Sequence, residues 1–163
     1  MSGVNVERAT PQDRAAIEAL LAANQLPTAG LQASLDTALV ARVGNRAIGC
    51  AALEVYSSGV LLRSVAVDAA WRGRGIGHQL TTAGLDLARS LGADAAFLLT
   101  TTAGEFFPRF GFARVERAEV PDDVQQSIEF RSACPSSALV MRAVLNGHPD
   151  DVFLPGPTFG EGR

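Results

Sequence analysis

One stretch, residues 65–80, constrains the fold of this 163-residue chain more than any other. The apolar, β-branched run that leads through Val65, Ala66 and Val67 suits a buried strand. A loop rich in glycine and arginine follows, and its residues are Arg72, Gly73, Arg74, Gly75, Ile76, Gly77 and His78. A helical pattern begins directly after these glycines. The stretch therefore predicts a strand, a glycine-rich loop and a helix in immediate succession.

This order of elements suits a ligand that carries phosphate. Glycine lets the backbone approach a ligand closely and adopt positive φ. The start of a helix presents unpaired N–H groups and a partial positive charge, to which Arg72 and Arg74 add full charges. We therefore expect an anion cradle here. The alternative is a glycine-rich turn that merely joins strand and helix.

The glycine spacing excludes two common phosphate sites. A dinucleotide fingerprint needs Gly-x-Gly-x-x-Gly, but its third glycine would fall on His78 or on Leu80. A P-loop needs a lysine after its glycine, and the basic residues of this loop are arginines. Nucleotide phosphate transfer is disfavoured as well, because no Mg²⁺-binding acid stands beside the loop.

Bulk properties narrow the function classes further. The length favours one domain with a substantial core, and a net charge of −3 gives no support for binding nucleic acid. Cys50 and Cys134 lack the spacing of metal ligands, so no metal site is expected. Because the sequence contains neither an apolar signal segment nor a run of membrane-spanning length, we expect a cytoplasmic protein with free thiols and no membrane partner.

Local signals predict the remaining elements. Thr10 and Pro11 begin a helix, Gly44-Asn45 makes a hairpin turn, and Asp122 or Asp123 begins another helix. Strands are expected at residues 5–8, 39–43, 47–56, 60–67, 95–100, after Gly111 and at 138–145. Helices are expected from residue 10, before 39, at 76–91, near 105–110 and at 122–130.

The chain changes character after residue 145. Residues 146–163 are rich in proline and glycine, so we expect one domain at 1–145 followed by a tail. Phe153, Leu154 and Phe159 could dock this tail on its own domain or on a second copy, which leaves a homodimer open.

One acidic residue stands out within an apolar strand. Regular alternation would place Ile48, Cys50, Ala52, Glu54 and Tyr56 on one face of the strand at 47–56. Glu54 would then lie beside the strand that leads to the glycine loop, where a carboxylate could remove a proton. The alternative is an exposed glutamate near the end of a strand.

Two segments resemble the GNAT superfamily of acyltransferases. Arg72-Gly73-Arg74-Gly75-Ile76-Gly77 resembles the family's pyrophosphate-binding loop, Arg/Gln-x-x-Gly-x-Gly/Ala, and Arg109-Phe110-Gly111-Phe112 resembles its aromatic and Gly-Phe segment. The resemblance covers residues 60–145 and, more weakly, the first 60. It implies the α/β (α+β) GNAT fold, a mixed, twisted central sheet with helices on both faces, in which two parallel strands splay apart around the cofactor.

The resemblance also implies a site for acetyl-CoA as cosubstrate. The backbone from Val65 through Ala66 to Val67 would pair with pantetheine, and the amides of residues 72–78 would bind the pyrophosphate. Thr100, Thr101 and Phe107 would line the far wall. The alternatives are strand propensity and helix capping for the threonines, and core packing for Phe107.

One position departs from the family's pattern. Many GNAT enzymes carry a tyrosine five residues before the Phe of Gly-Phe, and it protonates the departing thiolate; here that position is Phe107. Another group or water must then supply this proton, and the one tyrosine of the chain, Tyr56, is the next candidate. The candidate for the base is Glu54 or a water that Glu54 holds. The sequence predicts transfer of an acetyl group to the amine of a small molecule. The alternative is a catalytically weak CoA-binding sensor or interaction module.

A finer resemblance is to a bacterial GNAT branch associated with arsenic-resistance operons, carried by residues 53–56, 61–67, 98–102 and 134–138. It implies a link to arsenic resistance without naming the acceptor. Trivalent arsenic prefers two or three thiolates together. With Cys50 expected to be buried and Cys134 near the surface, we expect any such role to run through acylation of an amine.

Overall fold

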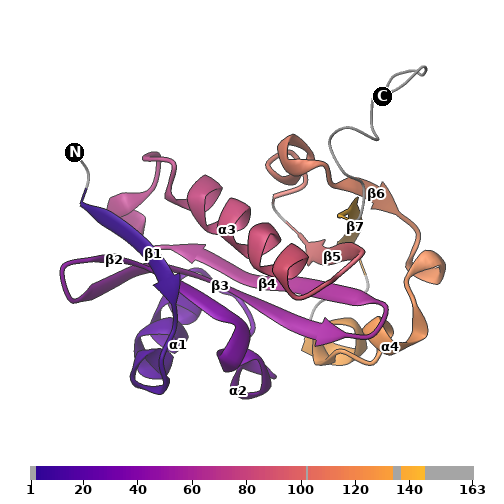
Figure 1. Cartoon of the computed structure of the whole chain (residues 1–163), viewed down its shortest axis with the longest axis horizontal. Helices are drawn as coiled ribbons and strands as arrows, with labels where there is room; N and C mark the ends of the chain where they lie inside the picture. The colour runs from indigo at the N-terminus through magenta and orange to yellow at the C-terminus, as the bar shows by residue number, and fades with distance from the viewer. Residues whose placement is uncertain (1–2, 102, 134–136, 146–163) are drawn as a thin grey trace.

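The computed structural model describes residues 3–101, 103–133 and 137–145. Within them the chain forms a seven-stranded sheet in the order β1-β2-β3-β4-β5-β7-β6 (Figure 1). Its strands are β1 (Val4–Arg8), β2 (Ala38–Val43), β3 (Arg46–Tyr56), β4 (Gly59–Val67), β5 (Ala95–Thr100), β6 (Ala113–Val115) and β7 (Leu139–Val144). The β4–β5 pair is parallel and the other pairs are antiparallel, so the sheet is mixed, as the resemblance implied.

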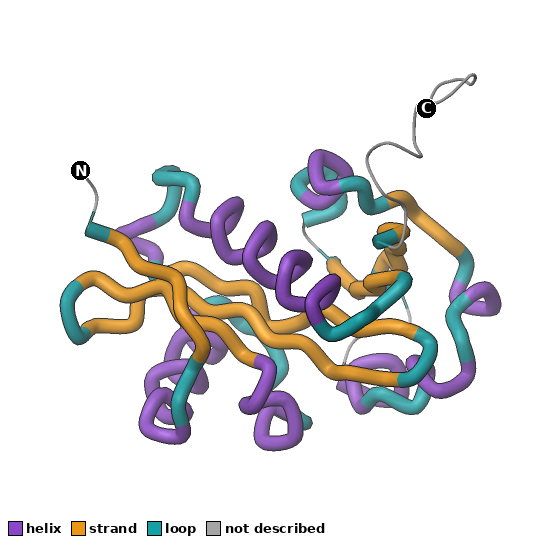
Figure 2. Tube along the Cα trace, in the orientation of Figure 1, coloured by secondary structure: helices purple, strands orange, loops and turns teal. Residues whose placement is uncertain are grey.

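Helices cover both faces of this sheet. They are α1 (Arg14–Ala23), α2 (Leu31–Ser34), α3 (Ile76–Ser90) and α4 (Asp122–Gln125). Shorter 3₁₀ turns lie at Pro11–Asp13, Leu35–Thr37, Ala69–Trp71, Phe107–Phe110 and Arg117–Glu119, and a π-helical turn lies at Glu129–Ala133. Figure 2 shows α3 along one face, with α1 and α2 on the other. The expected tail and Cys134 lie outside the described residues.

Each face has its own apolar core. On the α3 face, Leu80 and Leu85 pack in a cluster that also contains Leu53 and Leu62 of the central strands. On the α1 face, Ile17 and Leu21 pack with Val40, Cys50 and Ala66. Burying one such leucine or isoleucine side chain contributes about 1.5–3 kcal/mol. The two cores hold β3 and β4 rigidly between them, so the end of β4 is a firm support for a site.

A polar cluster fixes the start of α1, where the sequence predicted it. The Asp13 carboxylate accepts hydrogen bonds from the amide of Thr10 at 2.7 Å and from both Nη atoms of Arg42 at 2.8 and 2.6 Å. Arg42 also donates to Glu7 at 2.6 Å. The hydrogen bond from Arg42 is the main cause that lowers the pKa of Asp13 to about 2.

The parallel strands β4 and β5 part after two residue pairs. Val60 faces Ala96 and Leu61 faces Phe97, and no further pair forms. Beyond this point β4 carries a bulge, because Ser64 and Val65 together face one residue of β3. A bulge bends its strand and increases the local twist. The C-terminal half of β4 therefore diverges from β5, which confirms the splayed strands expected from the resemblance.

A second bulge corrects the expected face of Ile48. On β3, Ile48 is the extra residue between the pairs Ala41–Gly49 and Arg42–Ala47. Ile48 consequently packs in the α3-face core, whereas Cys50 belongs to the α1-face core. The prediction that these two residues share one face was wrong, because the alternation of side chains is interrupted by one residue at the bulge.

The helix expected at residues 122–130 is also shorter than predicted. α4 ends at Gln125, and the Ser127 hydroxyl accepts the amide of Glu129 at 3.1 Å. A serine side chain that binds a nearby backbone amide competes with the helical pattern. The cap was misassigned as well: Pro121 is the N-cap, and the Asp123 carboxylate instead accepts the amide of Ser58 at 3.0 Å.

Candidate functional site

A cavity of about 610 Å³ lies where the glycine-rich loop meets the end of β4. We call it the loop cavity. Its lining is residues 65–67, 71–73 and 75–78 with Asn24, Phe106 and Arg109. Apart from Arg74, every residue that the sequence placed in the pyrophosphate loop lines it.

The backbone of the loop explains its glycines. Gly73 and Gly75 both have φ of 78°, and a Cβ added at either would meet no atom within 4 Å. The need for glycine is therefore conformational and not one of space, because other residues avoid this region. Gly75 is the N-cap of α3, so the first amides of this 15-residue helix lie beside the cavity without partners inside the helix.

Three arginines make this region electropositive. The Arg72 guanidinium donates to Asn24 Oδ1 at 2.5 Å and to the Val67 carbonyl at 3.3 Å. Arg109 donates through Nε to the Phe106 carbonyl at 2.8 Å, and Arg74 stacks over the Trp71 ring at 4.7 Å. Within the described residues none of the three forms an ion pair, and no carboxylate lines the loop cavity. The charges are therefore free to attract an anion.

A second cavity, of about 580 Å³, fills the gap between the splayed strands, and we call it the splay cavity. Its lining is residues 24–27, 62–65 and 98–101 with Ala103, Phe107, Glu129 and Ala138. Val65 and Asn24 line both cavities, so the two meet at the end of β4. One cavity lies at the N-terminus of α3 and the other in the gap between β4 and β5.

The residues expected on the far wall lie in the splay cavity. Thr100 and Thr101 line it, although the Thr100 hydroxyl also accepts the amide of Ala103 at 2.9 Å, as expected of a capping role. Phe107 lines it too, while it packs against Phe106 and Phe112 at ring distances of 5.0 and 5.8 Å. Thr100 therefore lines the cavity and caps a turn, and Phe107 lines the cavity and packs against other aromatic rings.

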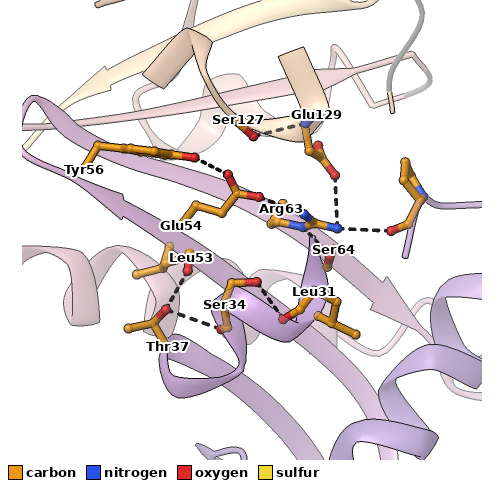
Figure 3. A network of polar contacts seen from close by, with 11 residues as sticks. Leu31, Ser34, Thr37, Leu53, Glu54, Tyr56, Arg63, Ser64, Ser127 and Glu129 are labelled. Atoms are coloured by element: carbon orange, nitrogen blue, oxygen red, sulfur yellow. Dashed lines mark hydrogen bonds and ion pairs between the residues drawn. The ribbon is translucent and has the colours of Figure 1, made fainter. Parts of the chain in front are cut away.

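A buried arginine connects the two acidic groups near this cavity (Figure 3). The Arg63 side chain is 0% exposed, and its Nη1 donates to Glu54 at 2.7 Å. Its Nη2 lies 3.5 Å from Glu129 Oε2 and donates to the Pro27 carbonyl at 3.3 Å. Its Nε donates to the Ser64 hydroxyl at 3.0 Å. The guanidinium is thus held in one orientation by four partners.

Glu54 and Tyr56, the expected base and acid, form part of this network but line neither cavity. The Tyr56 hydroxyl donates to Glu54 at 2.6 Å. Burial, and then this hydrogen bond, raises the pKa of Tyr56 to about 12. The Glu54 side chain is only 10% exposed, so the alternative of an exposed glutamate was wrong.

Sequence reasoning missed the two charged residues that do line the splay cavity, Arg63 and Glu129. The sequence did offer a signal for Arg63: a basic residue within an apolar strand indicates a buried charge that needs a partner. Glu129 had none, because it lies in a segment that was expected to be an ordinary helix.

Backbone strain points to the same cavity. In the described chain, two residues other than glycine have positive φ, Gln25 at 60° and Ser64 at 62°, and both line the splay cavity. Such conformations cost of order 1–3 kcal/mol and cluster at functional sites. A hydrogen bond also fixes the backbone of Ser64, because the buried Cys50 thiol donates to the Ser64 carbonyl at 3.2 Å. Burial raises the pKa of that thiol to about 12, so it is a thiol and not a thiolate at neutral pH.

Two further features are absent from the described residues. No cluster of three or more His, Cys, Asp or Glu side chains there could hold a metal ion. None of the helices in that part of the chain is long and apolar enough to cross a membrane.

Sequence comparison identifies relatives of this chain. A model of the acetyltransferase (GNAT) domain matches residues 34–114. The chain is 40% identical over 89 residues to an amino-acid acetyltransferase of Mycobacterium tuberculosis, a match that covers 52% of this chain and 51% of that protein. It is 30% identical over 105 residues to an uncharacterized N-acetyltransferase of Chlorobaculum tepidum, a match that covers 62% of this chain and 67% of that protein. The chain thus spans about half the length of the first relative.

Solved structures with the same fold lead to the same family. Rv2747 of Mycobacterium tuberculosis, in complex with CoA and NLQ, has a TM-score of 0.74 at 30% identity and covers 86% of this chain and 99% of its own. N-acetylglutamate synthase from Neisseria gonorrhoeae, complexed with coenzyme A and L-arginine, has a TM-score of 0.76 at 22% identity, covers 90% of this chain and 34% of its own, and supports the fold alone. The chain has the GNAT fold and belongs to the GNAT family of acetyltransferases.

Proposed function

We propose that this protein transfers an acetyl group from acetyl-CoA to the amino group of an amino acid. One observation carries the proposal: an electropositive cavity at a helix N-terminus shares Asn24 and Val65 in its lining with a second cavity between splayed strands. The relative named as an amino-acid acetyltransferase and the CoA complex of Rv2747 support the cosubstrate and the acceptor class.

In this proposal the loop cavity binds the phosphates of acetyl-CoA. The backbone amides from Arg72 to His78 donate to the pyrophosphate, and the positive end of α3 adds to the attraction. Arg72 and Arg109 supply charges that no carboxylate of the cavity lining offsets. The backbone from Val65 to Val67 would then guide the pantetheine arm, with Thr100, Thr101 and Phe107 across from it.

The chemistry would take place where the two cavities meet. The neutral amine nitrogen bonds to the thioester carbonyl carbon, the carbon–sulfur bond breaks, the nitrogen loses a proton and the CoA thiolate gains one. A direct role for Glu54 or Tyr56 in these proton transfers stays a prediction. Both lie beyond Arg63 and would need a relay through a group that lines the cavity.

Thiol release from acetyl-CoA tests the proposal. The purified chain would be given a panel of amino acids and simple amines, and we expect thiol release that depends on an amino-acid acceptor. Acetyl-CoA binding without release for any acceptor would instead support the sensor alternative, which the absence of a hydroxyl at Phe107 favours. An arsenic-containing amino acid in the same panel would test the finer resemblance, which remains a prediction.

A further inference from the structure

We infer that Arg63 is a positioning residue for the proposed acetyl transfer: it holds three walls of the splay cavity together without touching the acceptor. The inference rests on the proposed function and concerns how that cavity keeps its shape. The Arg63 side chain is 0% exposed. Four groups bind its guanidinium, those of Pro27, Glu54, Ser64 and Glu129 (Figure 3). The guanidinium therefore has no free face for a ligand and can act only through these partners.

The partners of Arg63 connect segments that lie far apart in the sequence. Pro27 lies in the loop between α1 and α2, and Glu129 begins the π-helical turn. Ser64 belongs to the bulge of β4. All three line the splay cavity. A single side chain thus joins the loop after α1, the bulged strand and the π-helical turn at one cavity.

An arginine suits this role and a lysine does not. The guanidinium carries its N–H donors in a fixed planar fork, so that Nε, Nη1 and Nη2 can bind different partners at once. Nε donates to Ser64 at 3.0 Å, Nη2 to Pro27 at 3.3 Å and Nη1 to Glu54 at 2.7 Å. Glu54 lines neither cavity, so its short, charged contact orients the fork from β3. A lysine has one nitrogen and cannot reach these partners together.

The chain also approaches the guanidinium closely at Gly30, the N-cap of α2. A Cβ built on Gly30 would lie 2.9 Å from Arg63 Nη1 and 2.6 Å from Cγ2 of Ile128. Gly30 has φ of 82°, so both its conformation and its surroundings require glycine. The segment that leads into α2 therefore packs directly against the Arg63 side chain. Arg63 supports this wall by contact as well as by its hydrogen bond to Pro27.

The two strained residues of the cavity lie beside the contacts of Arg63. Ser64, at φ 62°, accepts Nε through its hydroxyl, and Gln25, at φ 60°, stands two positions before Pro27. Such conformations persist only where the surrounding structure holds them. Val65 follows Ser64 and lines both cavities, so the position of the bulge affects both linings. Arg63 thereby helps to fix the end of β4 along which the thioester would lie.

Loosened walls should affect the reaction more than cosubstrate binding. None of the four partners of Arg63 lines the loop cavity, where the phosphates would bind. The acceptor amine and the thioester must instead be held in a precise orientation for attack. A misplacement of about 1 Å, even from a mutation far from the reacting atoms, can cost about 100-fold in rate.

The test compares Arg63→Lys with Arg42→Lys in the full chain. Arg42 is the matched control, because its guanidinium also binds carboxylates, those of Glu7 and Asp13, but lines neither cavity. Thiol release gives kcat, and calorimetry with CoA gives the Kd and counts the folded sites. We expect Arg63→Lys to lower kcat per CoA site about 100-fold while the Kd changes less than about threefold. Arg42→Lys should change neither. Wild-type kcat per site in Arg63→Lys would overturn the inference.

Amide hydrogen exchange tests the same inference without relying on activity. In Arg63→Lys we expect exchange to become about tenfold faster in residues 24–30, 62–66 and 127–131 together, while residues 76–90 keep the wild-type rate. Equal acceleration throughout the chain would show a loss of stability alone and overturn the inference. Slower turnover with unchanged exchange would indicate a direct contact with the acceptor and overturn it as well. A wild type that releases no thiol with any acceptor would refute the proposed function, while the exchange pattern would still decide whether Arg63 holds the walls.

Ser64→Ala keeps the inference testable if Arg63→Lys does not fold. This change removes one acceptor of the guanidinium, the hydroxyl bound by Nε, and leaves the other contacts in place. We expect kcat to fall about tenfold, the loss typical of one charged hydrogen bond, and exchange to accelerate in residues 62–66. Wild-type kcat with wild-type exchange would contradict the role of Arg63 at the bulge. A lower kcat with unchanged exchange would also contradict it, because the hydroxyl would then act on the substrate directly.

Discussion

The two cavities are built in different ways. The loop cavity is made almost entirely by one continuous stretch, residues 65–78, with three further residues. The splay cavity draws on several separate stretches, around residues 24–27, 62–65, 98–107, 129 and 138. The first is therefore a local structure that a short sequence can define. The second exists only after the sheet, α1 and the segment before β7 have come together.

Their charges differ as well. The loop cavity has arginines without carboxylates, whereas the splay cavity has one arginine that is paired with two glutamates. Unpaired positive charge beside a helix N-terminus suits a multiply charged phosphate. A buried cluster whose arginine is already paired with carboxylates is not suited to a multiply charged phosphate. Under the proposed function, the cosubstrate would bind in the loop cavity and the acceptor in the splay cavity, and this placement can be tested at each.

The largest expected effect is on cosubstrate binding. Gly75→Glu forces a side chain into the left-handed conformation at φ 78° and places a negative charge at the N-terminus of α3. We expect the Kd for CoA to rise about 100-fold, which corresponds to about 2.8 kcal/mol. Isothermal titration calorimetry measures it.

The matched control is Gly92→Glu, beyond the opposite end of α3. Gly92 also has positive φ, 84°, and open space around its Cβ position, so this variant carries the same strain without touching the loop cavity. Its CoA affinity should equal that of the wild type. Equal affinities in both glutamate variants would remove the loop as the phosphate site and erase the distinction between the cavities.

This difference in construction also explains what could be read from the sequence. The strands, the loop and α3 followed from local patterns, because glycine spacing and apolar periodicity act over a few residues. Ile48 was placed on the wrong face because a bulge is set by pairing between strands. Glu129 was missed because its partner, Arg63, is 66 positions away, and no local pattern records that distance.

A medium effect is expected at the N-terminal end of α1. The C-terminal end of this helix leads into Asn24 and Gln25, which line the splay cavity. Asp13 anchors the start of α1 through Arg42 and is 7% exposed. Asp13→Asn should lower the free energy of unfolding by about 2 kcal/mol at pH 7, the size of a charged hydrogen bond. Urea unfolding of both proteins measures the difference.

The lowered pKa of Asp13 determines how the stability difference between wild type and Asp13→Asn changes with pH. The pKa of Asp13 is lowered from 3.8 to about 2 in the folded protein, so its contribution is complete above pH 4 and is lost as the pH falls towards 2. The gap between wild type and Asp13→Asn should therefore be constant from pH 7 to pH 5 and shrink by pH 3. A gap that does not change at pH 3 would show that the anchor does not depend on the charge of Asp13.

The smallest effect is expected at Phe107, on the wall of the splay cavity near the meeting point with the loop cavity. Phe107→Tyr adds a hydroxyl that could protonate the departing CoA sulfur. A free thiol has a pKa of about 8.5, so this sulfur benefits from a proton mainly below that pH. We expect the turnover of Phe107→Tyr to exceed that of the wild type by less than about tenfold at pH 7, and the two turnover numbers to become equal above pH 9.

Phe112→Tyr is the control, because Phe112 packs against Phe107 but lines neither cavity. If both variants change turnover alike, the change reflects repacking of the aromatic rings. If Phe107→Tyr alone raises turnover, and only at the lower pH, the missing hydroxyl limits the reaction of the wild type.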